Sequence, residues 1–155
     1  VLVPATHSPF DVVVLADCVW SRFSHDILLR SIKDLLSRSK DARIYMVAGL
    51  HTGRSTLVHF FRHALAIGLC LVPVPPADVW PTCPQETTAL PGSEHIMELE
   101  VGGTWDEHET PYLTGQRRPF LLHRGSPDQE DEPIQVRNHW LTVSCMAWAA
   151  TEATP

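Results

Sequence analysis

The feature that most constrains the fold is an uninterrupted apolar run, Val12–Ala16, followed at once by an aspartate. The run is rich in β-branched residues. This composition favours a parallel strand covered by helices on both faces over an alternating, half-exposed strand. Ligands of open α/β sheets gather at the carboxyl ends of the strands. We therefore expect Ala16, Asp17 and Trp20 to lie where such a sheet would bind a ligand.

Strand and helix patterns alternate along the first half of the chain. The expected elements, in order, are a strand at Val12–Ala16, a helix at 24–36, a strand at 42–50, a helix at 56–67 and a strand at 69–74. Ser24 and Ser55 are placed to cap the two helices, and Gly68 is placed to end the second. The alternation predicts an α/β fold with right-handed crossovers around a parallel sheet.

The composition changes in the second half, where most of the 13 prolines lie. We expect mostly loop there, with a short strand at 96–101 and a solvated acidic loop at 126–133. A strong strand is expected at 139–148. The chain is thus expected to form a single partial domain with a core at 10–74, a long Pro/Gly-rich and acidic loop region at 75–137 and a terminal strand at 138–148.

Bulk properties exclude several classes of protein. The chain has 155 residues and 44% hydrophobic content, enough for one domain with a real core. Its net charge of -6 argues against a dedicated nucleic-acid binder. It has no apolar run approaching the roughly 18 residues of a membrane helix and no signal pattern, so we expect a cytoplasmic or nuclear protein. The four cysteines lack paired spacing, which favours buried thiols over a zinc site or disulfides.

Four blocks of the sequence together resemble one protein family. The blocks are Ala-Asp-Cys-Val-Trp at 16–20, His-Asp-Ile-Leu-Leu-Arg-Ser-Ile-Lys at 25–33, Ala-Gly-Leu-His-Thr-Gly-Arg at 48–54 and Arg-Asn-His-Trp-Leu-Thr-Val at 137–143. With these blocks the chain resembles the fungal nicotinamide N-methyltransferase-like proteins of methyltransferase family 16. That family is seven-β-stranded, depends on S-adenosylmethionine and also contains protein-lysine methyltransferases.

This resemblance implies the C-terminal half of a Rossmann-like class I methyltransferase fold. The elements would be strands four to seven with the intervening helices, and the last strand would be antiparallel. Strands one to three, with the glycine-rich turn and the acidic residue that hold the cofactor, are absent. None of the eight glycines forms a G-x-G turn after an apolar strand. The resemblance therefore implies half a cofactor pocket, and we expect the fragment alone to be inactive.

Methyl transfer from a sulfonium to nitrogen is an in-line displacement, which needs alignment, close approach and a deprotonated amine. A small residue at a strand end lets the cofactor approach the backbone, and the resemblance places Ala16 beside the adenosyl group. We expect Leu15, Ala16 and Asp17 to contact S-adenosylmethionine. Asp17 would accept a hydrogen bond from the incoming nitrogen or, alternatively, fix the loop.

Three further residues are candidates for catalysis or substrate binding. Trp20 would form an apolar wall or attract a cationic amine through its face, although packing is the alternative. His51 and Arg54 follow the next strand and would orient the substrate or pair with Asp17. We expect no metal site, because His59 and His63 lack the glutamate of an H-E-x-x-H motif.

The sequence leads to one preferred function and two alternatives. The preferred function is S-adenosylmethionine-dependent N-methylation of a protein lysine, a choice that rests on the resemblance. Methylation of nicotinamide or another small amine is the first alternative. A non-catalytic remnant or interaction module is the second, and the missing glycine turn favours it.

Overall fold

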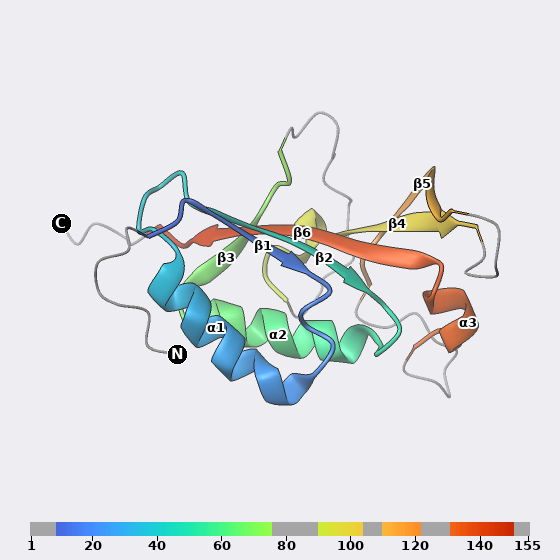
Figure 1. The fold of residues 1–155 in the computed structure, drawn as a ribbon, viewed down its shortest axis with the longest axis horizontal. Helices are drawn as coiled ribbons and strands as arrows, with labels where there is room; N and C mark the ends of the chain where they lie inside the picture. The colour runs from blue at the N-terminus through green and yellow to red at the C-terminus, as the bar shows by residue number, and fades with distance from the viewer. Residues whose placement is uncertain (1–8, 76–89, 104–109, 122–130, 151–155) are drawn as a thin grey trace.

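The computed structural model describes residues 9–75, 90–103, 110–121 and 131–150. They form an α/β fold with a mixed six-stranded sheet (Figure 1). The elements are β1 Val12–Ala16, η1 Arg22–Ser24, α1 His25–Leu35, β2 Arg43–Gly49, α2 Arg54–Ala66, β3 Leu69–Val72, η2 Ser93–His95, β4 Met97–Gly102, β5 Tyr112–Pro119, α3 Ile134–Arg137 and β6 Trp140–Trp148. The alternation of strands and helices expected for the first half is confirmed.

The last strand, β6, organises the sheet. β2 pairs with one side of β6, and β3 and β4 each pair with part of the other side, all antiparallel to β6. β1 pairs with β2 in parallel, as expected for strands joined by a helix. β5 extends the sheet beyond β4.

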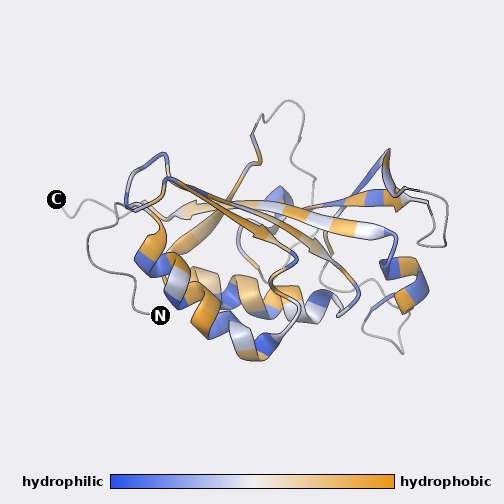
Figure 2. Ribbon diagram, viewed as in Figure 1, coloured by the Kyte–Doolittle hydropathy of each residue, from blue (hydrophilic) through white to orange (hydrophobic). Residues whose placement is uncertain are grey.

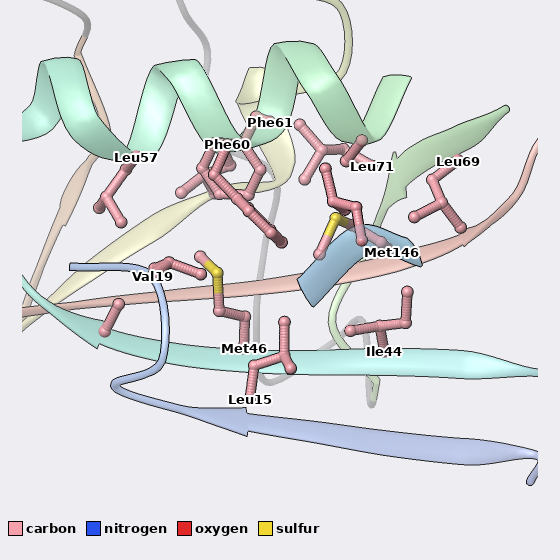
Figure 3. Packing of buried hydrophobic residues seen from close by; sticks show 14 of the residues in the cluster. Leu15, Val19, Ile44, Met46, Leu57, Phe60, Phe61, Leu69, Leu71 and Met146 are labelled. Atoms are coloured by element: carbon pink, nitrogen blue, oxygen red, sulfur yellow. The ribbon is translucent and has the colours of Figure 1, made fainter. Parts of the chain in front are cut away.

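The core lies between the sheet and the two long helices, which share one face of the sheet (Figures 1 and 3). Phe60 and Phe61 of α2 belong to this core, and Ile44 and Met46 of β2 point from the sheet toward the helix layer (Figure 3). All four side chains are fully buried. Burying side chains of this size stabilises a fold by about 1.5–3 kcal/mol each, so this layer fixes α2 on the sheet.

β1 is apolar throughout (Figure 2). The expectation that helices cover both faces of this strand is wrong, because the described elements cover only one face. Leu15 points into the core, whereas Val12 and Val14 on the opposite face are 53% and 65% exposed. Because α1 and α2 both pack on the same face, no described element covers the other face of this strand. β1 also has one free edge within the described part of the sheet.

Both helices differ from the expectation at their starts. The Ser24 hydroxyl donates to the carbonyl of Ser21 instead of capping α1. α2 begins at Arg54, so Ser55 lies inside the helix, and the cap position is Gly53 with φ 86°. Gly68 has φ 89°, which confirms it as the residue that ends α2.

The second half contains more structure than expected. β4 confirms the short strand, but β5 was missed, since its eight residues include a glycine, a proline and three polar side chains in sequence. The expected solvated acidic loop is wrong for its last two acidic residues, Asp131 and Glu132, whose side chains are only 16% exposed. The rest of that loop, 126–130, lies outside the described residues.

Candidate functional site

A cleft of about 490 Å³ lies at the carboxyl ends of the two parallel strands. Ala16 and Asp17 line it from the end of β1, and Gly49 and His51 line it from the end of β2. Trp140, at the start of β6, closes it from the neighbouring strand. Three of the candidate residues therefore meet at one place: Ala16, Asp17 and His51.

Asp17 connects the ends of the two strands. Its backbone N–H donates to the carbonyl of Val47 at 2.8 Å, and its side-chain Oδ1 accepts from the N–H of Gly49 at 3.1 Å. The residue has φ 51°, a conformation that aspartate and asparagine adopt more readily than most residues. The second carboxylate oxygen, Oδ2, has no hydrogen-bond partner among the described residues. Asp17 thus has a structural role through Oδ1 and a free acceptor in Oδ2.

His51 and Asp17 lie on either side of the Gly49 backbone. A Cβ atom placed on Gly49 would be 2.8 Å from Nδ1 of His51 and 3.7 Å from Oδ1 of Asp17. The His51 side chain is exposed and makes no hydrogen bond or ion pair with the described residues. It is therefore free to contact a molecule in the cleft.

Two of the other candidate residues do not take the expected places. Leu15 is 3% exposed and points into the core, so its side chain cannot contact a cofactor in the cleft (Figure 3). This corrects the expectation and follows from strand alternation, which turns Leu15 and Ala16 to opposite faces. Trp20 is 59% exposed and is not among the residues that line the cleft.

Arg54 is the clearest correction, because it is fully buried and contacts neither the cleft nor Asp17. Its Nε and Nη2 donate to the two carboxylate oxygens of Glu98, both at 2.7 Å. Its Nη1 pairs with Asp131, and Nη2 also donates to Glu132 at 3.0 Å. Such a bidentate arginine–carboxylate pair is strong and rigid. Arg54 is thus a structural residue and has no group left for a substrate.

Arg118 of β5 completes this buried ionic network. Its Nε donates to Oε2 of Glu98 at 2.6 Å, and its two Nη atoms donate to Glu132 at 2.8 and 2.7 Å. Burial acts to lower the pKa of Arg54, but Glu98, Asp131 and Glu132 outweigh it and raise that pKa above its usual value. Burial also acts to raise the pKa of Glu132, but Arg118 and Arg54 hold it below its usual value. The network joins α2, β4, β5 and residues 131–132.

Sequence reasoning missed the contribution of Asn138 and Trp140 to the cleft. Both lie within the block 137–143, which was assigned only to a terminal strand. The antiparallel pairing of Gly49 with Leu141 brings the start of β6 beside the end of β2. The signal was therefore present in the block, but using it required the strand register.

A second group of titratable side chains joins α1 to α2. The ring nitrogen Nε2 of buried His25 lies 2.9 Å from the carbonyl of Val19, and Nδ1 of His25 lies 2.9 Å from Nδ1 of His59. A carbonyl only accepts, so Nε2 of His25 carries a proton and, in the neutral ring, Nδ1 accepts from His59. Burial, together with the charges of His63, His25 and Arg22, lowers the pKa of His59 below 6.5.

The free energy of unfolding is expected to fall as the pH is lowered through 6.5. Because the folded-state pKa of His59 lies below its unfolded value, the unfolded chain binds more protons in this range and acid favours it. Urea unfolding at a series of pH values between about 5 and 8 measures the effect. His59→Gln keeps an N–H donor for His25 and should flatten the profile. A profile that rises toward acid, or a variant with an unchanged slope, would contradict the assignment.

The described residues contain no group of three His, Cys, Asp or Glu side chains arranged to hold a metal ion. Among the described cysteines, Cys145 is buried, and burial raises the pKa of its thiol to about 11, so it is a poor nucleophile. Cys18 is exposed and Cys70 is half-buried, so buried thiols are confirmed only for Cys145. Cys83 lies outside the described residues.

Comparisons of the chain with protein-family models, curated proteins and solved structures give no match. None of the helices that the structure describes has the length and apolar content needed to cross a bilayer.

Proposed function

We propose that this chain supplies the C-terminal part of an S-adenosylmethionine-dependent N-methyltransferase domain. The observation that carries the proposal is the cleft at the ends of β1 and β2, where Ala16, Asp17 and His51 meet. Its volume of about 490 Å³ lies in the usual range for small-molecule sites, and its position follows the rule for open α/β sheets.

The strand arrangement supports the same proposal. β1, β2, β3 and β6 occur in the order in which the resemblance implies strands four, five, six and seven. β6 is antiparallel to β2, β3 and β4, the three strands with which it pairs, as the resemblance implies for the last strand. The free edge of β1 suits further strands beside it, and the exposed Val12 and Val14 suit a layer of helices on the outer face of the sheet.

The residues present fit the adenosyl side of the cofactor. The Ala16 side chain is a single methyl group at an exposed strand end, so it leaves the cleft open to a flat ring system. The groups that would hold the methionine and ribose portions are not among the candidate residues. When bound, S-adenosylmethionine supplies an electrophilic methyl group at a sulfonium.

In the proposed reaction, the residues of this chain orient the amine that accepts the methyl group. Oδ2 of Asp17 accepts a hydrogen bond from the attacking nitrogen and aligns its lone pair with the methyl group. The Oδ1 bond to Gly49 fixes the carboxylate while this happens. His51, which faces the same cleft and is exposed, contacts the substrate and takes up the proton that the amine loses.

A transfer assay distinguishes the proposed substrates. The chain is expressed together with the segment encoded directly upstream of Val1, and labelled methyl groups from S-adenosylmethionine are offered to lysine-containing proteins and, separately, to nicotinamide. We expect label on protein lysine. Label on nicotinamide alone selects the small-amine alternative. An upstream segment without an apolar strand followed by G-x-G, combined with no transfer, would overturn the proposal and select the interaction module.

The 155-residue chain alone is expected to bind S-adenosylmethionine very weakly or not at all. The cleft provides one wall of a pocket, whereas a micromolar dissociation constant requires about 8 kcal/mol of binding free energy. Calorimetric titration of the isolated chain measures this affinity. Micromolar binding would show that the described residues already form a complete cofactor site and would contradict the half-pocket interpretation.

A further inference from the structure

A second pocket, of about 440 Å³, lies between η1 and α2, and no step of the proposed methyl transfer uses it. We propose that this pocket binds a phosphate group, either free or carried on a small molecule. The pocket is separate from the cleft at the strand ends, although adjacent residues line the two: Thr52 and Arg137 line the pocket, while His51 and Asn138 line the cleft.

The lining of the pocket is strongly cationic in a chain of net charge -6. Arg22, Arg62 and Arg137 line it, against a single carboxylate, Asp131. Asp131 is hydrogen bonded to Arg54 through both oxygens and also lies 3.7 Å from Nη1 of Arg137, whereas Arg22 and Arg62 have no carboxylate partner among the described residues. The arginines therefore leave an excess of positive charge, which favours an anion.

Unused hydrogen-bond donors point to an anion with several acceptor oxygens. Arg62 makes no side-chain hydrogen bond or ion pair within the described part of the chain. Nε of Arg137 is buried without a partner there, although Nη1 donates to the carbonyl of Leu50. Arg22 donates to the hydroxyl of Ser55, which also lines the pocket. Guanidinium groups bind phosphate well because their planar forks match pairs of its oxygens.

Two histidines of α2 also line this pocket, and they can carry additional positive charge when protonated. His59 and His63 line the pocket with their rings 4.1 Å apart. Their Nδ1 atoms are engaged by His25 and Asp26, respectively, while the Nε2 atoms have no partner among the described residues. The groups facing them from α1 and η1 are His25, Asp26 and Arg22. A phosphate dianion beside these rings stabilises their protonated forms.

Titration with inorganic phosphate at constant ionic strength, followed by NMR of the histidine ring protons, tests the proposal. Saturable shifts of His59 and His63 are expected, with a dissociation constant on the order of 1 mM and a rise in the pKa of His59. Arg62→Gln and Arg22→Gln should each weaken binding about fivefold. Lys40→Gln removes the same charge at an exposed turn away from the pocket and should leave binding unchanged.

Parallel titrations define the ligand. Phenyl phosphate binding more tightly than inorganic phosphate identifies a small phosphorylated molecule, and equal affinities identify free phosphate. Acetate is expected to bind more weakly than either, because it carries one charge and fewer acceptor oxygens. The absence of saturable shifts, or a loss of affinity in Lys40→Gln equal to that in Arg62→Gln, would overturn the proposal in favour of nonspecific charge attraction.

Discussion

Replacement of Arg54 by methionine is expected to lower the free energy of unfolding by about 3–5 kcal/mol, because the substitution leaves carboxylates buried without their main partner. Glu98 is fully buried, and two of its hydrogen bonds come from Arg54. Asp131 and Glu132 lose their bonds to the same guanidinium. Arg118 remains beside Glu98 and Glu132, and Arg137 remains 3.7 Å from Asp131, but neither replaces the two hydrogen bonds that Arg54 donates to buried Glu98.

Urea unfolding of matched variants measures this effect. Arg62→Met places the same substitution on an exposed position of the same helix and should change stability by no more than about 0.5 kcal/mol. Arg54→Lys keeps the charge but loses the bidentate geometry, so we expect an intermediate loss. A loss below about 1 kcal/mol in Arg54→Met would show that the buried ions are stabilised by something other than this arginine.

The sequence predicted local structure well because that structure depends on neighbouring residues. The apolar run of β1, the periodicity of α2 and the stop at Gly68 are all visible over a few positions. The burial of β1 was not predictable in this way. The composition of a strand indicates that its residues suit a sheet, but it does not indicate whether a second layer of helices covers the outer face of that sheet. Val14 is apolar and 65% exposed for this reason.

The candidate site likewise contains residues that a local pattern predicts and residues that only the packing of distant segments explains. Ala16, Asp17 and His51 were found because each follows a recognisable strand, and parallel strands bring their carboxyl ends together. Arg54 was misassigned because its partners lie 44, 77 and 78 residues away, the first in the expected short strand and the other two in the expected acidic loop. Contacts at such separations depend on how β4, β5 and residues 131–132 pack, and no local pattern encodes that arrangement.

The second large effect is expected at Asp17 in the complete protein that the proposed function requires. Asp17→Asn should lower turnover about 100-fold or more while leaving cofactor affinity nearly unchanged. Asparagine retains an oxygen for the N–H of Gly49 and tolerates φ 51°, so the strand ends stay connected. What the substitution removes is the negative charge and the acceptor at Oδ2, where the attacking nitrogen binds.

Ala16→Leu is the matched variant with the opposite expected result. Ala16 is exposed in the cleft, so a larger side chain fills the space of the adenosyl group without disturbing the core. We expect cofactor affinity to fall about tenfold, equivalent to about 1.4 kcal/mol. Steady-state kinetics and cofactor titration are measured for both variants after circular dichroism has shown that each is folded. Near-normal turnover in Asp17→Asn would remove the aspartate from the reaction, and unchanged affinity in Ala16→Leu would place the cofactor elsewhere.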